Sequence, residues 1–274
     1  MINLKNLNQR EVFDAFVGEI QEKQFAEIAL PVSEEVFRDA ADVFLDFLTL
    51  DQVTKNSLYR VHPVNPRDSG IGYVRKAKQE NYSDAKEYVH YLPIAHEYFK
   101  EEIAHGDPRI GAFFNMARDM HSQIVPVMED ILKMLTLEFP DIYDRFFPDE
   151  FENPRTPLRF LKYDVQGKGE FLARGHYDMA GCTLALAESA PGLRIGKNEE
   201  TLKPVTRKGG GAIFMPARNF PKMTDERFTP AWHDVVQSAH ARLSDTAARL
   251  AIVLFIAQKD LPLSSFEETH KPLS

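Results

Sequence analysis

Apolar residues in the first half of the chain recur mainly at the spacing of an α-helix. Along three segments the apolar side chains fall three or four positions apart, so that each segment has one apolar face. These segments are residues 9–21, 33–50 and 106–139. Residues 60–95 carry several prolines and glycines and are expected to be loop-like. The first 150 residues are therefore predicted to be mostly helical.

The second half of the chain changes to short strand-like segments bounded by turn residues. Glycine, proline and Lys-Asn turn signals separate several of these segments, and no helical pattern lies between them. The segments are residues 156–165, 182–189, 191–196, 202–206, 210–217 and 249–258. Short strands without intervening helices predict an antiparallel double-sheet barrel or jelly roll and disfavour a parallel α/β sheet.

We expect the two halves to share one core as a single domain over residues 1–274, a length that allows a sizeable core. The predicted fold class is α+β with a mainly β core. Residues 151–274 are expected to form a double-stranded β-helix (jelly roll) that carries the functional site. Residues 1–150 are expected to flank this core with helices.

The amino-acid composition restricts which binding partners and which cellular compartment we expect for this protein. The 41 acidic residues outnumber the 33 basic ones, giving a net charge of −8, and the basic residues form no long run. Nucleic acid and anionic membranes are therefore unexpected partners. Cys182 is the single cysteine, which excludes an internal disulfide and fits a reducing compartment. With no signal-peptide pattern and no apolar run long enough to span a bilayer, we expect a cytoplasmic protein. The oligomeric state stays open.

The chain contains two His-x-Asp triplets, which are candidate halves of a metal site. A triplet of this kind is a weak signal by itself. In the first triplet, His105 to Asp107, the aspartate precedes Pro108 at a predicted helix start, where a capping role is expected. In the second triplet, His176 and Asp178 belong to an extended segment between strands. Positions i and i+2 of such a segment point to the same side, so both side chains can approach one ion.

A metal site at this pair needs a third ligand from elsewhere in the chain. His233 lies 57 residues after His176 and is the preferred candidate. His240 is a competing candidate that falls in a segment with the look of an exposed loop or helical turn. Considered alone, His233 would be assigned as a hydrogen-bonded, partly buried histidine. Two histidines and one carboxylate on one face of an octahedral ion are the ligands of non-haem Fe(II), and the lack of thiolates favours iron over structural zinc.

Several motifs resemble those of the isopenicillin N synthase-like Fe(II)/2-oxoglutarate-dependent dioxygenases. "GHYD" is similar to the metal motif of that family and "AWHDV" to its second-histidine motif. "LRFLKYDV" resembles the strand whose tyrosine contacts the oxoacid, and "ARLAIVLFI" falls where the family carries Arg-x-Ser. "EVFRDAADVFLDFLTLDQVTK" and "GYVRKAKQENYSDAKEYVHY" are similar to N-terminal segments of the family, so the resemblance covers most of the chain.

The resemblance implies an enzyme and assigns roles to particular residues. His176, Asp178 and His233 would hold Fe(II), and Arg249 and Tyr163 would bind the cosubstrate 2-oxoglutarate. The implied reaction is the oxidation of a C–H bond of a small-molecule substrate by O₂. Its outcome would be hydroxylation, desaturation or cyclisation, with release of succinate and CO₂.

Outside the resemblance, Arg174 directly precedes the metal motif and is a candidate contact for an anionic substrate. A solvated surface charge is an equal alternative for it.

The chain departs from the family pattern near the predicted cosubstrate site. The family serine is Ala251, the asparagine that often precedes the strand tyrosine is Leu161, and the segment from His233 to Arg249 is longer than usual. These differences leave the iron ligands intact and affect the cosubstrate contacts. Two alternative functions therefore remain: a 2-oxoglutarate-independent Fe(II) oxidase of the same fold, and a non-catalytic jelly-roll binding module.

Overall fold

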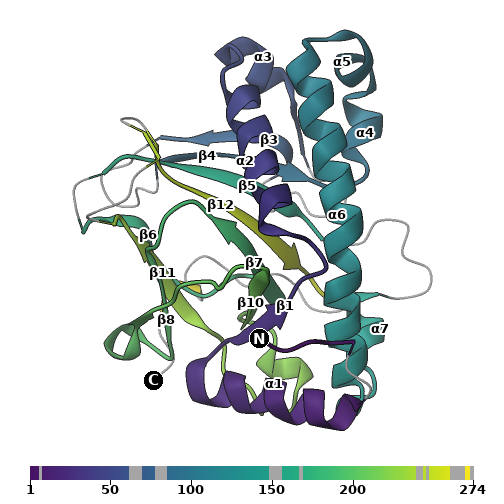
Figure 1. Ribbon diagram of the computed structural model, residues 1–274, viewed down its shortest axis with the longest axis vertical. Helices are drawn as coiled ribbons and strands as arrows, with labels where there is room; N and C mark the ends of the chain where they lie inside the picture. The colour runs from purple at the N-terminus through teal and green to yellow at the C-terminus, as the bar shows by residue number, and fades with distance from the viewer. Residues whose placement is uncertain are drawn as a thin grey trace.

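The computed structural model consists of two facing antiparallel β-sheets, with helices packed on the outer side of the larger sheet (Figure 1). It describes residues 1–5, 8–61, 70–77, 85–147, 156–166, 169–238, 243–244, 247–259 and 269–271. The predicted α+β jelly roll with N-terminal helices is confirmed. None of the described helices is both long enough and apolar enough to cross a membrane.

In the described part of the chain the larger sheet has eight strands in the order β1-β10-β7-β12-β5-β4-β3-β2. These strands are β1 (Ala26–Ala29), β2 (Tyr59–Arg60), β3 (Ile71–Lys76), β4 (Lys86–Tyr91), β5 (Leu158–Asp164), β7 (Cys182–Glu188), β10 (Gly211–Pro216) and β12 (Ala247–Ile256). The smaller sheet has the order β6-β11-β8-β9. Its strands are β6 (Phe171–His176), β8 (Leu193–Gly196), β9 (Lys203–Pro204) and β11 (Trp232–Val236).

The helices cover the outer face of the larger sheet, and α6 is the longest of those described. They are α1 (Gln9–Lys23), α2 (Glu34–Leu48), α3 (Gln52–Ser57), α4 (Ala95–Tyr98), α5 (Lys100–His105), α6 (Pro108–Leu135) and α7 (Ile142–Phe146). The Asp107 side chain caps α6 by accepting a hydrogen bond from the backbone N–H of Arg109, as the sequence predicts. The helix continues through Pro126.

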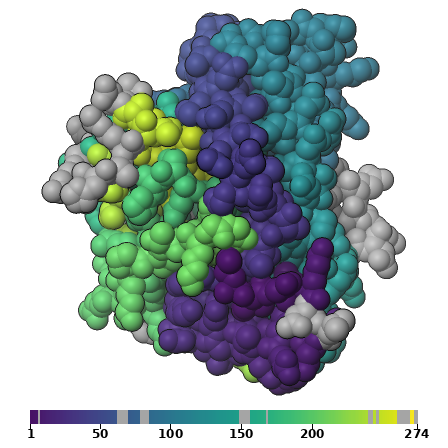
Figure 2. All heavy atoms as spheres, viewed as in Figure 1, coloured from purple at the N-terminus to yellow at the C-terminus, as the bar shows by residue number. Residues whose placement is uncertain are grey.

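Aromatic side chains join the helices to the sheet. Phe113 of α6 lies 5.6 Å from Phe44 of α2 and 5.2 Å from Phe160 of β5, measured between ring centroids. All three side chains are almost completely buried. Aromatic pairs in this distance range stabilise a core beyond the area that they bury. Figure 2 shows the N-terminal third of the chain, in purple and blue, packed directly against the green C-terminal half.

Alternation along β5 separates the helix-facing side of the larger sheet from the side that faces the smaller sheet. Leu158 and Phe160 belong to the apolar cluster that includes the helices. Leu161 and Tyr163 belong to a second cluster, which lies between the two sheets. This strand therefore contributes one row of side chains to the helix-packed core and another to the interior of the jelly roll.

The prediction of loop structure for residues 60–95 is wrong where β3 and β4 form. These strands, with β1 and β2, extend the larger sheet with residues from the N-terminal half. Most of β4 is buried on both faces. The alternation of apolar and polar residues that marks a half-exposed strand is therefore missing from its sequence.

Candidate metal centre

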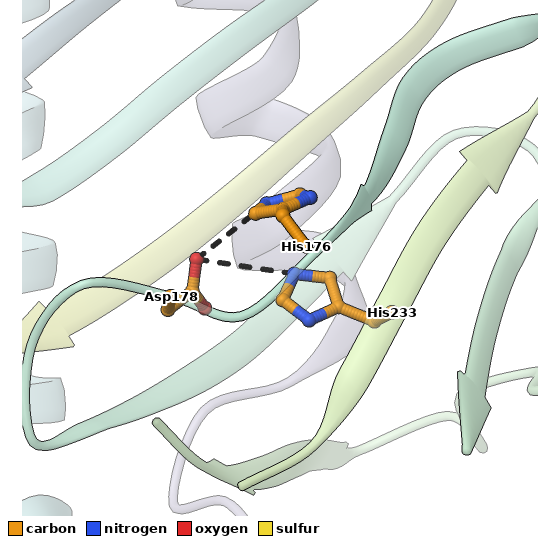
Figure 3. A group of neighbouring side chains, drawn as sticks. All are labelled: His176, Asp178 and His233. Atoms are coloured by element: carbon orange, nitrogen blue, oxygen red, sulfur yellow. Dashed lines mark ion pairs between the residues drawn. The ribbon is translucent and has the colours of Figure 1, made fainter. Parts of the chain in front are cut away.

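Three side chains predicted as metal ligands come together between the two sheets. His176 ends β6, Asp178 follows in the turn toward β7, and His233 lies near the start of β11. The antiparallel pairing of β6 with β11 places His176 directly opposite His233. One potential ligand atom from each of the three residues lies within 4.8 Å of the others. Figure 3 shows the two imidazole rings beside the Asp178 carboxylate. The pairing of two strands therefore brings together residues that are far apart in the sequence.

Hydrogen bonds fix both imidazole rings with the same nitrogen directed to the site. His176 Nδ1 lies 2.7 Å from the carbonyl oxygen of Arg174, and His233 Nδ1 lies 3.1 Å from that of Ala231. A carbonyl oxygen can only accept, so Nδ1 carries a proton in each ring, and the neutral form of each ring has its lone pair on Nε2. Both Nε2 atoms lie 3.8 Å from Asp178 Oδ1. Anchoring a metal-binding histidine through its other nitrogen is the usual arrangement around protein-bound metals.

The protonation states also suit metal binding. Burial, followed by the charge of His233, lowers the pKa of His176 to about 3, so its ring is neutral at neutral pH. Burial raises the pKa of Asp178, but the two histidines and the Thr183 hydroxyl outweigh it and hold that pKa below its ordinary value. Thr183 Oγ1 donates to Asp178 Oδ2 at 2.7 Å, which leaves Oδ1 directed toward the imidazoles. The two imidazole nitrogens and the ionised Asp178 oxygen form a donor set that fits Fe(II) and leaves room for further ligands.

Small and aromatic residues around the triad hold its backbone in place. A Cβ atom on Gly175 would lie 2.6 Å from the ring of Trp232, so glycine permits the close packing of β6 against β11. The ring of Tyr177 packs on the same tryptophan at a centroid distance of 4.9 Å. The backbone N–H of Tyr177 donates to the carbonyl of Thr269, and the ring of His270 stacks on His176. A C-terminal segment therefore lies beside the metal centre.

A partly open pocket contains the triad and extends between the sheets; its empty space is about 730 Å³ when the open solvent at its mouth is included. Much of its wall is apolar and comes from both sheets: Leu161, Leu193, Ile213, Met215, Val235 and Val253. Its charged residues besides Asp178 are Lys86, Arg159, Glu188, Arg207 and Arg249. An apolar pocket with a few convergent polar groups is typical of a small-molecule site.

The predicted cosubstrate residues Arg249 and Tyr163 are neighbours in this pocket. They are Cα partners on β12 and β5, and both are buried. The structure adds an ion pair: Arg249 Nη2 contacts the Glu188 carboxylate, while its Nε donates to the carbonyl of Ala190. Glu188 is the Cα partner of Ala251, the residue that replaces the family serine. The Glu188 carboxylate therefore accepts from Arg249 and uses part of the hydrogen-bonding capacity of its guanidinium.

Sequence reasoning missed Glu188, Lys86, Arg159 and Arg207 as pocket residues. Arg159 lies on the same side of β5 as Tyr163, four positions away, so the period of two along this strand could have predicted that Arg159 faces the pocket. Glu188 follows a register shift between β7 and β12, and such an irregularity interrupts the alternation from which faces are read. Arg207 lies outside the described strands, and its side chain pairs with Glu34 of α2.

Two further residues that the sequence suggested, Arg174 and His240, are not found at the candidate metal centre among the described residues. Arg174 is exposed on β6, and its guanidinium lies over the ring of Phe171. Arg174 is not among the described residues that line the pocket. Its backbone carbonyl, however, accepts from His176 Nδ1 and so orients that ring. His240, the competing third ligand, lies outside the described residues.

Comparison with solved structures shows which known proteins share this fold. The dioxygenase for auxin oxidation 1 from Arabidopsis thaliana, solved with 2-oxoglutarate, has a TM-score of 0.73 at 15% identity, covering 94% of this chain and 92% of the other. A full-length Neurospora crassa protein, solved in complex with alpha-KG, has a TM-score of 0.72 at 16% identity, with coverage of 98% and 90%. JOX2, solved with 2OG, Fe and JA, has a TM-score of 0.69 at 16% identity, with coverage of 97% and 77%.

The chain has the fold of the 2-oxoglutarate/Fe(II) oxygenases. No protein-family model and no curated protein matches its sequence. The likeness therefore lies in the three-dimensional structure, and the low identity leaves the activity of this chain to be argued from its own site.

Proposed function

We propose that this protein is an Fe(II)- and 2-oxoglutarate-dependent oxygenase that oxidises a C–H bond of a small molecule and releases succinate and CO₂. One observation carries the proposal: the Nε2 atoms of His176 and His233 converge on the Asp178 carboxylate inside an apolar pocket. The motif resemblance to the isopenicillin N synthase-like branch supports the same assignment. Structures of this fold have been solved with small molecules, such as thymine in the Neurospora crassa protein and JA in JOX2, which supports a small-molecule substrate.

Within this proposal the residues of the chain hold the metal, orient the side chains that bind it and exclude water from the pocket. His176, Asp178 and His233 hold the metal, and the backbone carbonyls behind the two rings keep their Nε2 lone pairs directed inward. Bound iron and 2-oxoglutarate supply the oxidising power, coupled to decarboxylation of the oxoacid to succinate.

We assign the cosubstrate 2-oxoglutarate to the end of the pocket that contains Arg249 and Tyr163. Arg249 and Tyr163 would bind the far carboxylate of the oxoacid, because a guanidinium pairs with a carboxylate through two parallel hydrogen bonds. The apolar wall excludes water, which strengthens these contacts.

Anaerobic titration of the protein with Fe(II) in the presence of 2-oxoglutarate tests the assignment. We expect the weak visible absorption band of an Fe(II)–oxoacid complex in the wild type and its loss in Asp178→Ala. Asp107→Ala is the matched control, since it changes the other His-x-Asp triplet, whose aspartate caps α6. A wild type without the band, or an Asp178→Ala variant that keeps it, contradicts the proposal. The first result is what a non-catalytic binding module would give.

A second candidate function is an Fe(II) oxidase of the same fold that takes all its electrons from the substrate. The ion pair of Arg249 with Glu188 and the absence of a hydroxyl at Ala251 favour it, because both reduce the contacts offered to an oxoacid. Oxygen consumption that depends on substrate and not on 2-oxoglutarate would distinguish this function from the first.

A further inference from the structure

Arg159 is a cation of the pocket whose contacts with the described residues are with the rings of Tyr88, Phe255 and His90. Its guanidinium carbon lies 4.9 Å from the ring centroid of Tyr88 and 4.5 Å from that of Phe255. Its Nε donates to His90 Nε2 at 2.6 Å. No carboxylate among the described residues forms a salt bridge with it. Rings on a guanidinium stabilise the charge through cation–π attraction, but they do not accept hydrogen bonds from its terminal N–H groups in the way that a carboxylate does.

A buried histidine fixes the orientation of this guanidinium. His90 Nδ1 lies 3.1 Å from the carbonyl oxygen of Gly70, so Nδ1 carries the proton and Nε2 is the acceptor for Arg159. His90 is only 1% exposed, and it is the Cα partner of Arg159 across β4 and β5. With Nε occupied, the two terminal nitrogens remain for a ligand. They form the pair of donors that matches the two oxygens of a carboxylate.

Arg159 lies at the metal end of the pocket, away from the predicted cosubstrate residues. Along β12, Tyr163 pairs with Arg249, whereas Arg159 pairs with Val253, which is four residues further on. Four residues of strand correspond to about 13 Å. The positive charge of Arg159 also contributes to holding the pKa of Asp178 down, which places it within electrostatic range of the metal centre. An oxoacid that extends from the metal to Arg249 leaves Arg159 for a different ligand.

We propose that Arg159 forms the anion-binding subsite for the substrate, and that the substrate is a carboxylic acid with an apolar body. The guanidinium would pair with the substrate carboxylate through its terminal nitrogens. The aliphatic and aromatic wall, including Val253 and Phe255, would contact the rest of the molecule. This inference rests on the proposed oxygenase function, which supplies the iron and the oxoacid beside the subsite.

Matched acids and amides test the subsite by anaerobic calorimetry on protein saturated with Fe(II) and 2-oxoglutarate. The probes are hexanoate with hexanamide and 3-phenylpropionate with 3-phenylpropionamide. In the wild type we expect the acids to bind about tenfold or more tightly than the amides, because the carboxylate adds an attraction between opposite charges and a second acceptor oxygen for the guanidinium. Arg159→Leu should abolish the preference and Arg159→Lys should retain part of it. Arg118→Leu, which removes an exposed arginine from α6, should leave the preference unchanged.

The outcomes separate this inference from the proposed function. Equal binding of acids and amides in the wild type, or a preference that survives in Arg159→Leu, overturns the subsite. An Arg159→Leu variant that loses affinity for 2-oxoglutarate as well would assign Arg159 to the oxoacid and also overturn it. If the wild type forms no Fe(II)–oxoacid band, the oxygenase proposal fails. The comparison of acids with amides on metal-free protein then still decides whether Arg159 selects a carboxylate.

Discussion

Replacing Glu188 with glutamine should strengthen the binding of 2-oxoglutarate. In the structure the Glu188 carboxylate pairs with Arg249, and the side chains of the two residues are only 12% and 6% exposed. If Arg249 binds the far carboxylate of the oxoacid, that carboxylate must compete with Glu188 for the same guanidinium. Glu188→Gln keeps the shape of the side chain and an oxygen that can accept from Arg249, but it removes the competing charge.

The size of the effect follows from the contact that is weakened. Arg249 is charged in both proteins, so the substitution changes an ion pair into a hydrogen bond with one charged partner, that is, from the upper to the lower end of the roughly 1.5–3 kcal/mol that hydrogen bonds to charged groups contribute. The variant should therefore hold Arg249 less strongly by about 1–1.5 kcal/mol, and little of this is lost to solvent screening because both side chains are buried. Since about 1.4 kcal/mol corresponds to tenfold in affinity, 2-oxoglutarate should bind about tenfold more tightly. The ligand-free variant should unfold at a temperature a few degrees lower.

Anaerobic titration of the Fe(II)-loaded protein, followed by the visible band and by calorimetry, measures the affinity. Glu34→Gln is the matched control, because Glu34 pairs with Arg207, another arginine of the pocket wall. It should destabilise the protein without tightening oxoacid binding. Unchanged affinity in Glu188→Gln, or the same gain in Glu34→Gln, would refute the competition between Glu188 and the cosubstrate.

Two further predictions concern the candidate metal centre and its supports, and a third concerns the cap of α6. Thr183→Val should lower the affinity for Fe(II) by about tenfold or more, since it removes the hydroxyl that orients Asp178; equal Fe(II) affinity by competition with a chelator would contradict this role. Gly175→Ala should destabilise the protein by about 1–3 kcal/mol, because its Cβ would collide with the ring of Trp232, and an unchanged denaturation midpoint would count against that contact. The neighbouring arginine side chain and a backbone N–H lower the pKa of Asp107 from 3.8 to about 2. Its stabilisation should therefore be complete above pH 3.8 and disappear as the pH falls through about 2, so the melting temperatures of wild type and Asp107→Asn should converge over that range. A difference that stays constant down to about pH 2 would exclude the carboxylate as its source.

Local patterns in the sequence predicted the three longest of the described helices, many of the strands and two residues of the candidate metal centre. Three segments with helical periodicity correspond to α1, α2 and α6, because an amphipathic helix repeats its apolar positions within a few residues. His176 and Asp178 were identifiable because positions i and i+2 of an extended segment face the same side. Strand periodicity could also have predicted that Arg159 faces the pocket, because it lies on the same face of β5 as Tyr163.

Only the tertiary structure decided which distant residues meet. The position of His233 opposite His176 depends on the pairing of β6 with β11, and that register is set by contacts across the whole sheet. The pairing of Glu188 with Arg249 depends on how β7 and β12 align beyond a register shift, which local periodicity does not encode. The buried strand β4 was missed because a strand covered on both faces lacks the alternation that marks a half-exposed one. Periodicity records which side of its own element a residue faces, whereas partners across a sheet are fixed by the packing of the complete chain.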